Sequence, residues 1–218
     1  VVGAFAVGLT NGAFWTLGPV FARDDGGADG AAIFMAIGAI SGAVGQWPLG
    51  RASDKMDRRR VIVFACLGAA AAGGLMWRLG GISEDLRLAC AAAFGLFAIP
   101  VYALTAAHMN DMIEADGFIE AASGLLLTFS LGAVLGPIIA SAAVEAYGQR
   151  SLFAFTGAVH LALVGFTLCR MRIRAPAAEA DRGVFAEAIL QAQTVAQVES
   201  FASDVAPNSA AGSGPKEQ

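Results

Sequence analysis

The chain has 218 residues, of which 56% are hydrophobic and only 15% are charged, and its mean hydropathy is +0.62. Soluble domains average about 45–50% apolar and about 25% charged residues, so this composition favours a membrane protein over a soluble core rich in Ala and Gly. The net charge of −4, with no basic face outside one loop, argues against a nucleic-acid partner.

Apolar windows that are almost free of charge predict membrane-spanning helices, since about 20 apolar residues cross a bilayer. Six such windows cover residues 1–21, 30–49, 61–80, 86–107, 119–144 and 151–170. In lipid, backbone polar groups must be satisfied within each segment, and the windows lack the alternation of a β-barrel. The predicted fold class is therefore an all-α membrane protein, a six-transmembrane-helix bundle over residues 1–172 in contact with the lipid bilayer.

The arginines and lysines predict how the bundle is oriented. Short connections make neighbouring helices antiparallel, so each connection can be assigned to one of two sides. One side holds Arg51, Lys55, Arg58, Arg59, Arg60, Arg170, Arg172 and Arg174, and the other holds Arg23, Arg78, Arg87 and Arg150. Because cytoplasmic loops carry the excess of basic residues, we expect the loop at 51–60 and both ends of the chain to be cytoplasmic.

The fifth window carries small residues at four-residue spacing, namely Gly124, Thr128, Gly132, Gly136 and Ala140. Small residues let membrane helices approach closely, so we expect this face to pack against another helix. Gly8 with Gly12 and Gly38 with Gly42 repeat the spacing.

The composition changes after the sixth window. Residues 173–218 are rich in Ala, Gln, Glu and Ser and predict a mostly disordered cytoplasmic tail. The stretch 181–201 is compatible with a helix. We interpret the tail as a solvated appendage, with a partner-binding or membrane-surface helix as the alternative.

The connection between the second and third windows reads GRASDKMDRRR from Gly50 to Arg60. It resembles the major facilitator superfamily motif G-x-x-x-D-[RK]-x-G-[RK]-[RK]. The matching residues are Gly50, Asp54, Lys55, Arg58 and Arg59, while Asp57 replaces the usual glycine. In the fifth window, Gly132, Gly136 and Pro137 are similar to the Gly-xxx-Gly-Pro motif of the family's fifth and eleventh helices.

The resemblance implies a secondary transporter that moves a small solute by alternating access. A complete facilitator has two six-helix halves, and the runs 11–22 and 102–111 resemble the C-terminal half of a poorly characterised bacterial drug-and-sugar-type branch. The resemblance therefore implies an N-terminal six-helix half as partner and the bacterial inner membrane as location. A truncated, transport-inactive scaffold or interaction protein is the alternative.

The same resemblance gives the loop a gating role. In the family, the acid at the position of Asp54 pairs with a nearby arginine and faces a helix N-terminus of the other half while the cytoplasmic side is closed. A plain topological anchor is the alternative. For Gly136 and Pro137, a bend and close-packing point is favoured over incidental helix irregularity.

Polar residues in the first and fourth windows are candidates for a substrate cavity. Asn11 and Trp15 are four residues apart and share a helix face, as Tyr102 and Thr105 do, with His108 a turn further on. Interhelical ties are the alternative role. His160 is interpreted as a packed residue.

The sequence shows no reactive constellation. Cys66, Cys90 and Cys169 lie singly in apolar runs and predict neither a disulfide framework nor a metal site. There is no dinucleotide fingerprint and no central pair of carboxylates. We therefore expect a protein that is not an enzyme and that has no cofactor and no metal.

Overall fold

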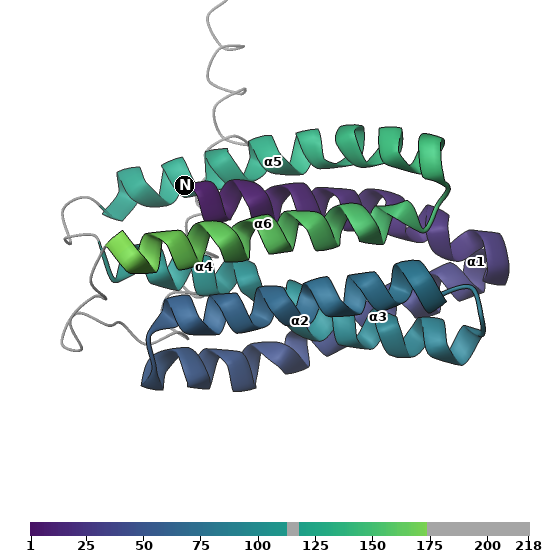
Figure 1. Cartoon of the computed structure of the whole chain (residues 1–218), viewed down its shortest axis with the longest axis horizontal. Coiled ribbons are helices and arrows are strands. Elements are labelled where there is room, and N and C mark those ends of the chain that lie inside the picture. The colour runs from purple at the N-terminus through teal and green to yellow at the C-terminus, as the bar shows by residue number, and fades with distance from the viewer. Residues whose placement is uncertain (113–117, 174–218) are drawn as a thin grey trace, which may run out of the picture.

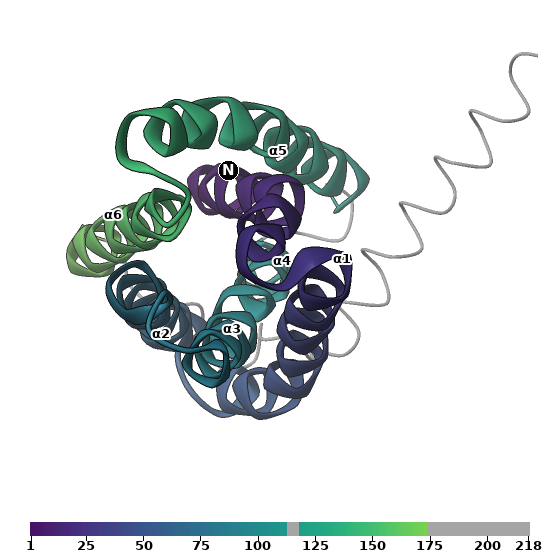
Figure 2. The same cartoon turned by 90° about the vertical axis from the view of Figure 1, so that its right-hand side faces the viewer.

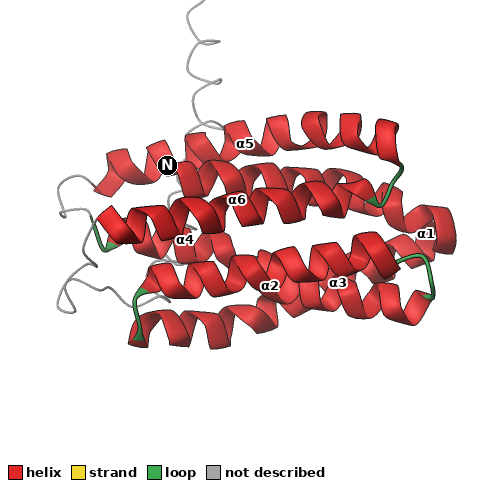
Figure 3. Ribbon diagram, in the orientation of Figure 1, coloured by secondary structure: helices red, strands yellow, loops and turns green. Residues whose placement is uncertain are grey.

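The computed structural model describes residues 1–112 and 118–173, without the side chains of residues 24–26 and 118–119. Every regular element in these ranges is a helix (Figure 3). In chain order they are α1 (Val2–Lys55), α2 (Arg58–Leu79), α3 (Glu84–Ala98), α4 (Pro100–Asn110), α5 (Phe118–Tyr147) and α6 (Ser151–Ile173). The predicted all-α fold class is confirmed. Apart from Ile173, the predicted tail at 173–218 and its possible helix at 181–201 lie outside the described residues.

The first two predicted windows both lie in α1. The backbone leaves helical geometry at Gly27, where φ is 65° and ψ is −157°, a conformation that a residue with a Cβ rarely adopts. The first arm of α1, residues 2–26, and its second arm, residues 27–55, run in opposite directions along the bundle (Figure 1). The connection between these windows is therefore a glycine kink.

The fourth predicted window is divided between α3 and α4. Pro100 begins α4, and because proline has no N–H it cannot donate the usual hydrogen bond to the preceding turn. The break falls at Ile99, whose own backbone stays in the helical region with φ −64° and ψ −43°. The window therefore holds a local interruption that its apolar pattern did not predict.

Five helical segments of the described chain are long and apolar enough to cross a membrane. They are Gly27–Lys55, Arg58–Leu79, Glu84–Asn110, Glu120–Tyr147 and Ser151–Ile173. They correspond to the second to sixth predicted windows. The first window is helical as the first arm of α1 but is not among the five.

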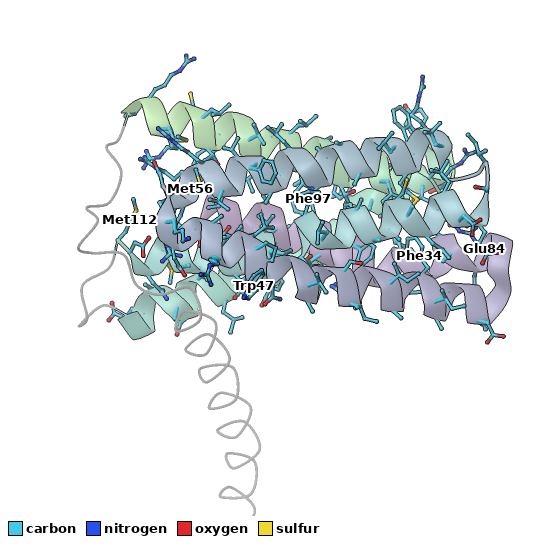
Figure 4. The ribbon with its side chains drawn as sticks, turned by 90° about the horizontal axis from the view of Figure 1, so that it is seen from below. Phe34, Trp47, Met56, Glu84, Phe97 and Met112 are labelled. Carbon is cyan, nitrogen blue, oxygen red and sulfur yellow. The ribbon has the colours of Figure 1, made fainter. Side chains whose placement is uncertain are left out.

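The helices lie along one long axis, so their ends gather at two ends of the bundle (Figure 1). At the loop end, α1 leads into α2, α4 ends, α5 begins and α6 ends. At the kink end, α1 bends, α2 leads into α3, and α5 leads into α6. Figure 4 places Met56 and Met112 at the loop end and Glu84 at the kink end.

Seen along the axis, the helices form a ring (Figure 2). The first arm of α1 packs on α5, α2 packs between α6 and α3, and the second arm of α1 lies beside α3. The centre is filled by Phe14, Phe34, Phe94 and Phe153, all buried. The Phe14 and Phe94 ring centroids are 5.2 Å apart and those of Phe94 and Phe153 are 5.7 Å apart, distances typical of favourable aromatic pairs.

Glycines set the contact between α1 and α5. A Cβ at Gly8 or Gly12 would overlap the backbone of Phe129 or Ala133 on α5. Likewise, a Cβ at Gly132 or Gly136 would overlap the carbonyl oxygens of Phe5 and Leu9 on α1. The two glycine pairs therefore face each other, and the backbones approach more closely than any larger residue allows. By contrast, Gly124 has open space around it, so the predicted small-residue face makes close contact over only part of its length.

We predict that Gly136→Ala lowers the free energy of unfolding of the purified protein by about 1–3 kcal/mol, because the new methyl group must displace the α1 backbone. The measurement is denaturation by dodecyl sulfate in mixed micelles. Gly124→Ala is the matched control on the same helix, and it should be neutral or stabilising because alanine favours helix by about 1 kcal/mol over glycine. Equal destabilisation by both variants would contradict the proposed close contact.

Candidate functional site

Arg58 is the centre of a buried polar network at the loop end. It is the first residue of α2, and its side chain is only 2% exposed. Its Nε donates to Oδ2 of Asp111 at 2.6 Å, and the Asp111 side chain is also 2% exposed. Its Nη1 donates to Oγ of Ser53 at 3.1 Å. One guanidinium thus joins the last turn of α1, the first turn of α2 and the residue that follows α4.

The polar groups of this network form a continuous chain of hydrogen bonds. The Ser53 hydroxyl donates to the Gly50 carbonyl oxygen at 2.8 Å while its oxygen accepts from Arg58. A buried charge is costly unless it is paired and hydrogen-bonded, and the short contact to Asp111 provides both. The arrangement therefore holds three helix ends in one relative position.

Asp54 lies at the edge of this network. Its Oδ1 is 3.5 Å from Nη1 of Arg58, four residues further along the chain, and its side chain is 34% exposed. A separation of 3.5 Å is at the outer limit for a hydrogen bond, so the contact is weaker than that with Asp111. Lys55 is exposed in the last turn of α1, where a cation is favoured by the helix dipole.

Asp57 is the N-cap of α2. Its φ of −58° is not left-handed, and its Oδ1 accepts from the backbone N–H of Arg59 at 3.0 Å. The Arg59 side chain also bonds this carboxylate, with Nη2 2.9 Å from Oδ2. Burial alone would raise the pKa of Asp57, but the hydrogen bonds and charge of Arg59 outweigh it and hold the pKa below its usual range. The residue that departs from the family motif therefore starts the next helix by capping it.

The predicted cavity residues do not come together at one place. Thr105 and His108 line a cavity of about 360 Å³ at the loop end. Tyr102 instead packs on Phe129 of α5, with ring centroids 4.7 Å apart. Asn11 is partly buried on the first arm of α1, and Trp15 is exposed there against Phe14. Neither of these two lines the loop-end cavity.

Two other features bear on the sequence expectations. His160 is buried in α6, with Nδ1 2.7 Å from the Thr156 carbonyl oxygen, and it packs against Phe94.

Across residues 1–112 and 118–173, no group of three or more His, Cys, Asp or Glu side chains is arranged to hold a metal ion.

One tryptophan–arginine pair lies on the second arm of α1 and another lies in the last turn of α2. The Arg51 guanidinium carbon is 5.8 Å from the Trp47 ring centroid, and that of Arg78 is 5.7 Å from the Trp77 centroid. Both tryptophans are exposed. Tryptophan and arginine are typical of the membrane–water interface, where the ring sits at the headgroups and the cation reaches water.

Comparison with known proteins agrees with this architecture. Residues 1–211 match the Major Facilitator Superfamily. The uncharacterized MFS-type transporter YcaD of Salmonella paratyphi B is 28% identical over 181 residues, which are 80% of this chain and 43% of the relative, and YcaD of Salmonella newport gives the same values. The crystal structure of the human organic anion transporter MFSD10 (TETRAN) aligns with a TM-score of 0.59 and 19% identity, over 77% of this chain and 45% of that chain.

The helical bundle, with five segments of membrane-spanning length among the described residues, defines a multi-pass membrane protein. Because the superfamily match extends over most of its residues, the chain belongs to the Major Facilitator Superfamily. The chain spans about half the length of the curated relatives it matches, which is 43% for YcaD.

Sequence reasoning identified Arg58 but missed two of its partners, Asp111 and Ser53. Asp111 is 53 residues away along the chain, and no local spacing connects the two. A usable signal was the predicted topology, because it placed the acidic stretch after the fourth window on the same side as the basic loop. Ser53 lies within the motif at one of its unspecified positions.

We predict that Asp111→Ala lowers the free energy of unfolding by about 3 kcal/mol, because it leaves the buried Arg58 cation without its main counter-charge. Glu145→Ala, an exposed acid on α5, is the control and should change stability by less than about 0.5 kcal/mol. In the double variant Arg58→Leu/Asp111→Leu, the loss should be smaller than the sum of the losses measured for Arg58→Leu alone and Asp111→Leu alone. Strict additivity in this double-mutant cycle would show that the ion pair contributes no coupling.

Proposed function

We propose that this chain forms the C-terminal half of a secondary transporter that moves a small solute by alternating access. An N-terminal six-helix half would complete the pathway, with the solute bound between the halves near the bilayer midplane. Membership of the superfamily and the relation to carriers about twice as long support this proposal. A transport-inactive scaffold is less favoured, because the loop keeps the motif residues in an ordered arrangement.

The observation that carries the proposal is the contrast in burial between Arg58 and Asp54 in that loop. Arg58 is locked by buried partners, whereas Asp54 beside it keeps a third of its side-chain surface exposed. A carboxylate held at a bundle end in this way can meet the N-terminus of a helix in the other half, a contact worth roughly 0.3–1 kcal/mol, or about 2 kcal/mol when partly buried. Such a contact forms only while that end is closed, so it biases the conformational equilibrium.

The proposed orientation puts the loop end in the cytoplasm of a bacterial cell, with the inner membrane around the bundle. Support comes from the excess of basic residues at this end. Asn11, Trp15, Tyr102, Thr105 and His108 remain candidates for contact with the solute. The drug-and-sugar-type branch is a proposal that rests on sequence resemblance.

To test the orientation, cysteine would be placed at Met56, exposed at the loop end, or at Ile82, exposed at the kink end, after Cys66, Cys90 and Cys169 are replaced by alanine. We predict that a membrane-impermeant maleimide labels Met56→Cys in inside-out vesicles and Ile82→Cys in intact spheroplasts. The reverse labelling pattern would overturn the proposed orientation.

For the gating role, the intact carrier would be reconstituted in proteoliposomes and screened against a panel of solutes. We predict that Asp54→Asn slows transport about tenfold or more through loss of the closed-state contact, with a smaller change in apparent solute affinity. Asp29→Asn, which neutralises an exposed acid at the kink end, is the control and should transport normally. If Asp54→Asn matches this control, the loop is only a topological anchor.

A further inference from the structure

The loop-end cavity is a separate feature within this one bundle. Its walls come from the start of α1, the first turns of α2, the end of α4, α5 and the last turns of α6. Its volume of about 360 Å³ lies in the range of pockets that hold small organic ligands. Of the five residues that the sequence suggested for solute contact, Thr105 and His108 line it, whereas Asn11, Trp15 and Tyr102 do not.

The walls of the cavity are apolar. They include Ile62 of α2, Met109 of α4, Leu125 of α5, and Leu163 and Phe166 of α6. Four helices thus contribute alkyl or aromatic surface to one space. A chain of methylene groups placed there would be removed from water, which favours its binding.

The charged side chains among the described residues that line the cavity are those of Arg59 and Arg170. Arg59, Arg170 and His108 line it together with Thr105 and Thr167, and none of the described lining residues is acidic. The nearby carboxylates of Asp57 and Asp111 are bonded to Arg59 and Arg58 respectively. Arg170, exposed in the last turn of α6, is therefore the cation best placed to meet a ligand's anionic group.

We propose that this cavity binds an anionic amphiphile, with one acyl chain among the helices and a carboxylate or phosphate at Arg170. Basic pockets between membrane helices on the cytoplasmic side suit such headgroups. Two sources share this chemistry, namely an anionic phospholipid of the surrounding leaflet and a free fatty acid. The proposal concerns the bundle itself and does not depend on the carrier function.

Fluorescence of cis-parinaric acid, an 18-carbon fatty acid, would be titrated with the purified protein. We expect saturable binding that oleate displaces and a cationic alkylammonium of equal chain length does not. Arg170→Gln should weaken binding by roughly two- to fivefold, the range for losing one partly exposed charge pair. Arg172→Gln, exposed two residues further on and outside the lining, should leave the affinity unchanged.

A second pair of variants tests whether the ligand occupies the cavity, independently of the charge of Arg170. Thr167→Phe adds a ring to the lining and should weaken parinarate binding more than tenfold, whereas Leu168→Phe on the exposed side of the same turn should have no effect. Retention of the helical circular dichroism signal would establish that each variant is folded. Non-saturable binding, or equal affinities across both pairs, would overturn the proposal.

Native mass spectrometry then separates the two sources. Protein extracted from vesicles of phosphatidylglycerol and phosphatidylcholine should retain phosphatidylglycerol if the ligand comes from the bilayer, and Thr167→Phe should lose this adduct. Retention of neither lipid, together with saturable parinarate binding, would assign the site to a free fatty acid. Retention of phosphatidylcholine as strongly as phosphatidylglycerol would overturn the role of charge.

Discussion

The approach of helix backbones to one another is the constraint on which this bundle depends. In lipid, apolar side chains gain little by leaving the solvent, so association depends on packing and on the few polar contacts available. The glycines that α1 and α5 present to each other supply that packing, and Gly45 and Gly95 do the same between the second arm of α1 and α3. Since α1 holds two antiparallel arms, it packs closely on α5 through its first arm and on α3 through its second arm.

The polar network at the loop end adds what glycine contacts cannot provide, which is a defined position along the helix axes. Helices that touch through small residues can slide, whereas a guanidinium with directed bonds fixes the helix ends that it joins. Arg58 does this for α1, α2 and the end of α4, and Asp57 sets the start of α2 by capping it. Among the three ion-paired acids described at this end, Asp54 has a more exposed side chain than Asp57 or Asp111. Asp54 is also the residue proposed to contact the other half.

Much of this architecture could be predicted from the sequence, because spans in lipid must be helical and apolar. The motif likewise located Asp54 and Arg58, which lie four residues apart on either side of the break between α1 and α2. The pairing with Asp111 could not be predicted, since it depends on how α4 packs against α2. The division of the fourth window between α3 and α4 could have been predicted from Pro100, because proline lacks an N–H. The sequence also could not show that Thr105 and His108 line a cavity that excludes Asn11. Helical spacing tells which residues share a face of a helix, but not which neighbouring helix packs against that face.

The two tryptophan–arginine pairs also lie on the helices that the Arg58 network joins. Trp47 with Arg51 lies on the second arm of α1, and Trp77 with Arg78 lies in the last turn of α2. An indole ring beside a guanidinium favours the headgroup layer of a membrane, and a mismatch between a helix and its bilayer costs fractions of a kcal/mol per Å. Because the Arg58 network joins the end of α1 to the start of α2, a tilt that the bilayer imposes on one of these helices is transmitted to the other.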